Sequence, residues 1–144
     1  MREKGIVLIT ILLIVSAALL LGAVLARILI SDYGIMSLSI SKAEAFYIAE
    51  AGIEKGKCEV VANPNFYTDL SGSGNEILWL LNEAKGENFT LGEGRFKIVK
   101  EKDKKVLYSV GYLGDDMKKS RALSLMKAEY TFPPFKVISW QELK

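Results

Sequence analysis

An uncharged apolar run near the N-terminus limits the possible folds of this chain more than any other feature. The run extends over 21 residues, from Ile6 to Ala26, before Arg27 interrupts it and three further apolar residues follow. An α-helix rises about 1.5 Å per residue, so roughly 20 residues cross the ~30 Å hydrocarbon core of a bilayer. We therefore predict that residues 6–30 form a membrane-spanning helix.

The rest of the chain is long enough for one small domain, and it lacks residues that catalysis commonly uses. The sequence has 144 residues, a formal net charge of +2, no histidine and one cysteine, Cys58. Without histidine there is no Ser-His or Cys-His nucleophile pair, and the commonest zinc ligand is missing. A single cysteine forms no disulfide within the chain. We therefore expect a protein that is not an enzyme and that uses neither a metal nor a cofactor.

The residues before the apolar run indicate how the helix is oriented in a membrane. Arg2 and Lys4 predict a cytoplasmic N-terminus, because positive charges stay on the cytoplasmic side. A single-pass membrane anchor is one interpretation of this segment. A secretory signal cleaved after Ala26 is another, although an apolar region of about 20 residues exceeds the 7 to 15 usual for such signals.

A third interpretation explains why the apolar run begins directly after a glycine. Residues 1–5, Met-Arg-Glu-Lys-Gly, resemble the class III leader of type IV prepilins. The resemblance implies that a prepilin peptidase cuts between Gly5 and Ile6 on the cytoplasmic side, and that the new amine of Ile6 is then N-methylated. Glycine suits this junction because it leaves the scissile backbone unobstructed by a side chain.

The helical pattern continues beyond the predicted membrane span. No proline occurs before Pro64, and residues 31–61 are amphipathic, so we predict a single helix from Ile6 to about Val61. A helix whose outer half is amphipathic needs a protein surface to pack against. The predicted packing stripe consists of Ala45, Ala49 and Ile53, with Phe46 at its border.

The segment AFYIAEAGIEKG, which starts at Ala45, is similar to the corresponding region of PilX-type minor pilins and of type II secretion pseudopilins. The resemblance implies an α+β fold in which a long N-terminal helix packs against a small antiparallel sheet. Its implied partners are other pilins or pseudopilins bound through N-terminal helix packing, the prepilin peptidase and an inner-membrane assembly platform. Such a protein spans the inner membrane once before processing and belongs to a periplasmic or extracellular filament afterwards.

Residues 62–144 are predicted to form a small globular head. Asn75 is a candidate N-cap for a short helix that ends at Gly86, after a loop rich in Asn, Pro, Gly and Ser. From Gly94 apolar and polar residues alternate, turn at a Lys-Asp-Lys cluster, and alternate again over Val106–Leu113. With the alternating segment RALSLMKAEY, these patterns predict an antiparallel sheet of at least three strands.

The C-terminal segment combines a strand breaker with many apolar residues. Pro133 and Pro134 prevent the continuation of a central strand. The apolar residues around them predict that the segment packs on the head. The alternative is an exposed strip that docks a partner, with Phe132, Phe135 and Trp140 as the candidate contacts.

Thr10 and Gly22 bear on the role within a filament. Major pilins resembling this family normally have Glu at the fifth residue after cleavage, where it neutralises the N-terminal amine of a neighbouring subunit. Here that residue is Thr10, which cannot neutralise an ammonium group. We therefore favour a minor subunit of the assembly-initiating or tip complex. Gly22 is a candidate contact between packed helices, or alternatively a local weak point of the helix.

The remaining polar motifs are given structural roles. We expect Asp115 and Asp116 to form a solvated turn, and the cluster KEKDKK at residues 100–105 to be a soluble hairpin tip rather than a nucleic-acid site. Nucleic-acid binding is not expected, because phosphate recognition needs more clustered positive charge. Cys58 is expected to be buried rather than to bridge two subunits. The alternative function is that of a single-pass, membrane-anchored exported binding protein unrelated to a filament.

Overall fold

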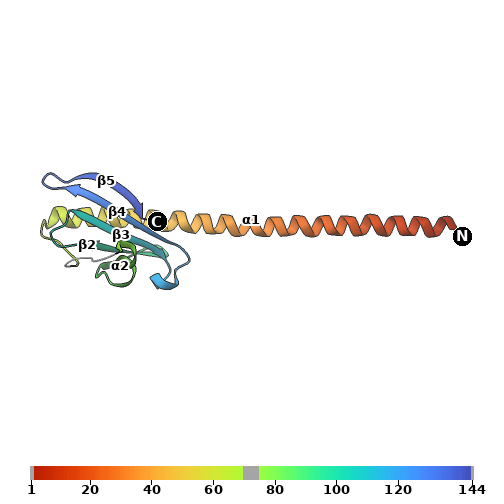
Figure 1. The fold of residues 1–144 in the computed structure, drawn as a ribbon, viewed down its shortest axis with the longest axis horizontal. Coiled ribbons are helices and arrows are strands. Elements are labelled where there is room, and N and C mark those ends of the chain that lie inside the picture. The colour runs from red at the N-terminus through yellow and green to blue at the C-terminus, as the bar shows by residue number, and fades with distance from the viewer. Residues whose placement is uncertain (1, 70–74, 144) are drawn as a thin grey trace. The chain divides into compact units, whose positions relative to one another are not determined.

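The computed structural model describes residues 2–69 and 75–143, and it has the predicted α+β architecture (Figure 1). Helix α1 extends from Arg2 to Ala62, which confirms the predicted long helix and continues it into the leader segment. The chain divides into two compact units, residues 1–39 and 40–144, and α1 contributes to both. We describe each unit separately.

The first unit is the apolar part of α1. A helix that is long and apolar enough to cross a membrane begins at Ile6, with a mean hydropathy of 2.9 in its most apolar window. None of that window is buried by the rest of the protein. The chain therefore has one N-terminal helix with the length and composition of a membrane span.

The second unit contains a five-stranded antiparallel sheet in which sequential strands are neighbours, in the order β1-β2-β3-β4-β5. The predicted sheet of at least three strands is confirmed as β2, β3 and β4, and β1 and β5 add an edge strand on each side. The elements that follow α1 are α2 (Glu76–Asn82), β1 (Glu87–Leu91), β2 (Gly94–Lys100), β3 (Val106–Leu113), the 3-10 helix η1 (Met117–Lys119), β4 (Leu123–Thr131) and β5 (Lys136–Leu143).

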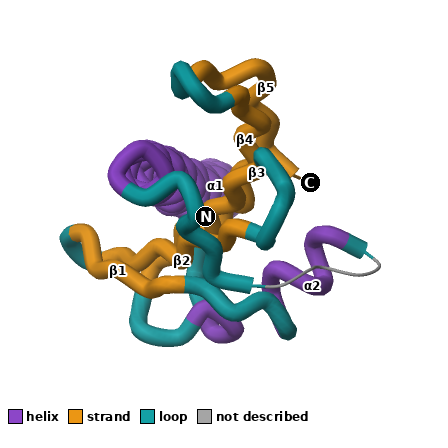
Figure 2. Tube along the Cα trace, turned by 90° about the vertical axis from the view of Figure 1, so that its left-hand side faces the viewer, coloured by secondary structure: helices purple, strands orange, loops and turns teal. Residues whose placement is uncertain are grey.

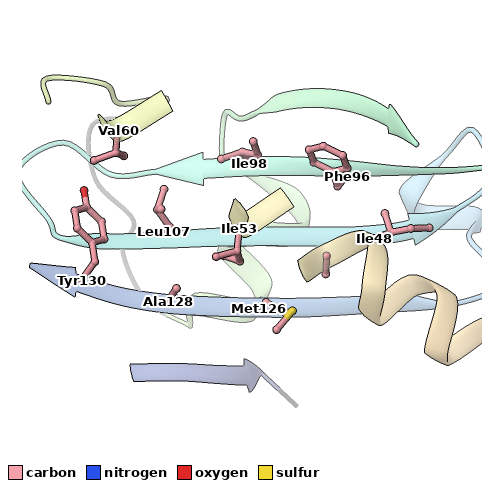
Figure 3. Packing of buried hydrophobic residues seen from close by; sticks show 10 residues of the cluster. Ile48, Ile53, Val60, Phe96, Ile98, Leu107, Met126, Ala128 and Tyr130 are labelled. Atoms are coloured by element: carbon pink, nitrogen blue, oxygen red, sulfur yellow. The ribbon is translucent and has the colours of Figure 1, made fainter. Parts of the chain in front are cut away.

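The sheet is covered on both faces, by the last part of α1 on one side and by α2 on the other (Figure 2). On the α1 face, Ile48, Ile53 and Val60 pack against the central strands (Figure 3). The sheet residues of this cluster are Phe96, Ile98, Leu107, Met126, Ala128 and Tyr130. On the α2 face, Trp79 and Leu80 pack against Val99, Tyr108, Val110, Tyr112 and Leu125. The two helices therefore pack on opposite faces of one sheet and bury its central strands between them.

Helix α2 begins as predicted but ends earlier. The side-chain oxygen of Asn75 accepts hydrogen bonds from the backbone N–H groups of Ile77 and Leu78, at 2.9 and 3.3 Å, which confirms the N-cap. The helix ends at Asn82 rather than at Gly86. The chain must turn there, because Gly86 lies against β2, where an added Cβ would be 2.6 Å from the carbonyl oxygen of Ile98.

Candidate functional site

The contact between α1 and the sheet is built from small residues. The buried face of α1 carries Ala45, Ala49, Gly52 and Gly56, spaced three or four residues apart, and Gly111 of β3 lies opposite. A Cβ atom at Gly111 would lie 2.8 Å from Cα of Ala49, and closer still to the carbonyl oxygen of Ala45 and the amide nitrogen of Ala49. The backbone of the strand therefore touches the helix backbone at Gly111, whereas Gly52 and Gly56 face side chains of the sheet; we call these five residues the small-residue seam.

The helix glycines of the seam lie close to side chains of the sheet, whereas the strand glycine lies against helix backbone. A Cβ at Gly52 would collide with the hydroxyl of Ser109, and one at Gly56 would lie 3.1 Å from Cγ2 of Ile98. The Ser109 hydroxyl is buried and finds no hydrogen-bond partner among the described residues. The predicted stripe of Ala45, Ala49 and Ile53 is buried, and Phe46 packs at its border. The AEAG segment thus has a packing role inside the head.

The candidate positions of the N-terminal segment all lie on α1. Gly5 and Ile6 are consecutive helical residues, so the helix continues through the predicted cleavage bond. The hydroxyl of Thr10 donates to the carbonyl oxygen of Ile6 at 3.0 Å, so its hydrogen-bonding capacity is met within its own helix. A Cβ added at Gly22 would have no described atom within 4 Å beyond its local helix backbone. Among the described residues Gly22 therefore has no close-packing partner.

A second apolar surface follows the predicted membrane span. Tyr33, Ile35, Met36 and Leu38 lie beyond Asp32 on α1, and each side chain is between 50% and 72% exposed. We call these four residues the outer apolar segment. Exposed large apolar side chains of this kind are a candidate contact surface.

The C-terminal aromatic residues divide into two groups. Phe132 and Phe135 pack against the α1-side core, where the ring of Phe135 stacks on Tyr130 with centroids 4.8 Å apart. Trp140 lies in edge strand β5 and is 40% exposed, and Ile138 of the same strand is 65% exposed. The expected packing on the head therefore holds for the aromatic residues before β5, whereas β5 itself leaves large apolar side chains in solvent.

The turn between β2 and β3 is an exposed tip at residues 102–105, as expected, but its first two residues are not. Lys100 and Glu101 are buried, at 5% and 2% exposure. The Lys100 ammonium donates to the carbonyl oxygens of Glu101 and Lys104, at 2.7 and 2.5 Å, and burial lowers the pKa of Lys100. Lys104 pairs with Glu101 at 2.7 Å. Lys100 stabilises the turn, because the backbone carbonyls of Glu101 and Lys104 accept hydrogen bonds from its buried ammonium group.

The opposite face of the sheet carries two further polar attachments. The ammonium of Lys97 donates to the carbonyl oxygens of Leu80 and Ala84, at 2.5 and 3.2 Å, and so binds the C-terminal end of α2. Burial lowers the pKa of Lys97. Glu76, at the start of α2, accepts a hydrogen bond from the Tyr108 hydroxyl at 3.1 Å and pairs with Lys127 at 2.9 Å. Both ends of α2 are therefore tied to strands.

Two of the smaller expectations have opposite outcomes. Cys58 is exposed, so the expectation of a buried thiol is wrong. Asp115 and Asp116 form the predicted turn. Asp115 pairs with Arg95 at 2.6 Å, and Asp116 caps η1 by accepting from the amide of Lys118 at 2.9 Å. Both carboxylates are therefore used in local structure.

The chain's relationships were sought by comparison with other proteins. Neither protein-family models, nor curated proteins, nor solved structures give a match to this chain. Within residues 2–69 and 75–143 no three side chains of His, Cys, Asp or Glu are grouped as metal ligands. The features that bear on function are therefore the sequence motifs, the surfaces of α1 and the head.

Proposed function

We propose that the chain is a minor pilin or pseudopilin, a structural subunit that joins a type IV pilus or a type II secretion-like filament and catalyses no reaction. The arrangement of a long N-terminal helix with its last turns on a small antiparallel sheet supports this proposal. The leader of residues 1–5 supports it independently, because fold and leader are separate features of the sequence.

The outer apolar segment is the observation that carries the proposal. Residues 6–30 are 25 residues long, about 37 Å as a helix, which a bilayer core of about 30 Å accommodates with an ordinary tilt. Tyr33, Ile35, Met36 and Leu38 lie beyond that length and beyond Asp32, yet they are exposed. A membrane anchor needs no such residues, whereas helices packed side by side in a filament would cover them.

Thr10 supports a place in the initiating or tip complex. A Glu at this position would neutralise the N-terminal amine of another subunit in the apolar filament interior. The Thr10 hydroxyl is bonded to the carbonyl of Ile6 in its own helix and offers no charge. A subunit without such a carboxylate suits a position with no neighbour to neutralise.

Photo-crosslinking from the outer apolar segment tests the proposal. A photoreactive phenylalanine analogue replaces Met36 in the full chain in the native host, and the matched control carries it at Leu78, which is 59% exposed on α2. We expect adducts from position 36 with proteins that begin with a prepilin-type leader and an apolar helix, and none of these from position 78. Adducts with lipid alone at position 36 would favour the membrane-anchored binding protein instead.

A further inference from the structure

The end of the head at which α1 terminates contains a cleft of about 300 Å³. Its walls come from the chain directly after α1, from the β2–β3 turn and from the β4–β5 connection. All three belong to the second unit. A volume of about 300 Å³ is at the small end of ligand sites in proteins, so the cleft suits one ring-sized group.

The charges that line the cleft are mostly positive. Four lysines of the β2–β3 turn line it, against the single carboxylate of Asp103. Lys100 is occupied with backbone carbonyls and Lys104 with Glu101. Lys102 and Lys105 are exposed, and neither forms an ion pair within the described part of the chain. The cleft therefore offers two ammonium groups to an anion.

Aromatic side chains form the other part of the lining. Tyr67 is 48% exposed, and the ammonium of Lys102 lies 5.8 Å from the centroid of its ring. Phe66 and Phe132, which are half-buried, and Tyr130, which is buried, also line the cleft. A ligand in this cleft would meet aromatic surface and ammonium groups close to each other.

We propose that the cleft binds a carboxylated sugar ring, a uronic acid unit of an acidic polysaccharide. The pyranose ring has an apolar face of C–H groups that can lie on Tyr67, and its carboxylate carries the charge that Lys102 and Lys105 can neutralise. Lysine is a point charge without the planar fork of arginine, so it accepts a carboxylate in many orientations. The proposal is independent of filament assembly, because every residue of the cleft lies in the head.

Single-stranded nucleic acid is the competing polyanion. Proteins that bind it stack successive bases on several aromatic side chains along a basic groove. Here the cleft has a volume of only about 300 Å³, and Tyr67 is the one exposed aromatic side chain of its lining. The dimensions therefore favour a single ring over a run of bases.

Binding to the full chain in lipid nanodiscs tests the proposal, with trigalacturonate as the probe and ligand-observed NMR as the readout. The cleft variant is Lys102→Gln/Lys105→Gln. Its matched control, Lys118→Gln/Lys119→Gln, removes the same charge from exposed residues of η1 outside the cleft. We expect the cleft variant to weaken binding at least tenfold and the control less than twofold, with a comparable loss in Tyr67→Ala.

Three results would overturn the proposal. These are no binding of trigalacturonate by the wild type, equal weakening in the two lysine variants, and tighter binding of a thymidine trinucleotide than of trigalacturonate. Neutral galactotriose should not bind, and affinity for trigalacturonate should fall as salt is raised, because exposed charges are screened. A circular dichroism melt of each variant checks its folding, which exposed residues should not alter.

Discussion

Gly111 and Ala49 show how strongly single residues determine the packing of this fold. Their backbones are so close that no side chain fits between them, and the helix side of the contact needs the small residues Ala45, Gly52 and Gly56 as well. Close packing of this kind has little room to relax, so an added methyl group must displace backbone.

We predict that Gly111→Ala destabilises the head by about 3 kcal/mol, because its Cβ would overlap the backbone of α1. Gly34→Ala is the matched control, since a Cβ there has no described atom within 4 Å beyond the local helix backbone and alanine favours helix by about 1 kcal/mol. Urea unfolding of the full chain in detergent, followed by the fluorescence of buried Trp79, measures the difference. Equal urea-unfolding midpoints for the two variants would contradict the close backbone contact at Gly111.

Tyr108 predicts how stability depends on alkaline pH. Burial, and then the charge of Glu76, raise the pKa of its hydroxyl. The unfolded phenol ionises near pH 10, so the stabilisation is complete below that pH and is lost as pH rises through the higher folded pKa. Tyr108→Phe should cost about 1 kcal/mol at pH 8, from the lost hydrogen bond, and less at pH 11.

Unfolding midpoints between pH 8 and pH 11 test this expectation. Tyr47→Phe is the matched control, because its ring is 66% exposed. The control should follow the wild type at every pH, whereas the Tyr108→Phe curve should approach it above pH 10. A constant difference between Tyr108→Phe and the wild type would show that the Tyr108 proton is not linked to folding.

At the scale of elements, the segment after β4 contains packed and exposed apolar side chains, and Phe135 and Trp140 represent the two kinds. Phe135 stacks on Tyr130 and has the Lys57 ammonium 5.9 Å from its ring centroid, whereas Trp140 is 40% exposed. We predict that Phe135→Ala lowers the free energy of unfolding by about 2 kcal/mol and Trp140→Ala by less than about 1 kcal/mol. Urea unfolding of both variants tests this, and a larger loss for Trp140→Ala would contradict the assignment of β5 as an exposed edge.

The elements that the sequence predicts well are those with a strong local pattern. Helix α1 follows from its uninterrupted helical pattern before Pro64, and β2, β3 and β4 follow from alternation. Strand β1 has little alternation to detect, because all but one of its residues are exposed. Strand β5 was not predicted, because Pro133 and Pro134 indicate a break; they lie in the connection, and an edge strand can begin after it.

Only part of the small-residue seam and of the β2–β3 turn can be predicted from the sequence. The stripe of Ala45 and Ala49 has a helical spacing that anticipates its burial. The role of Gly111 depends on which strand lies under α1, and a local pattern does not contain that information. The burial of Lys100 cannot be predicted from the sequence either. Its neighbours are charged, which is typical of exposed lysines, and its carbonyl partners are known only from the structure.

At the scale of the whole molecule, Thr10 predicts how assembly responds to charge. Thr10→Glu introduces a carboxylate that can neutralise the amine of a neighbouring subunit, so we expect more of the chain in sheared filaments. Thr10→Ala should leave assembly near the wild-type level, because the Thr10 hydroxyl is bonded within its own helix. Quantitative immunoblots of the filament fraction measure both. If neither variant differs from the wild type, the charge at position 10 does not control assembly.

The N-terminal residue of the protein extracted from membranes tests the proposed function most directly. Intact-mass and peptide mass spectrometry would be done on the full chain from hosts with and without the prepilin peptidase. A filament subunit predicts a start at N-methylated Ile6 in the first host and retention of the leader in the second. A start at Met1 in both hosts would indicate a membrane anchor, and a start at Arg27 a secreted protein; either result would contradict the proposed function.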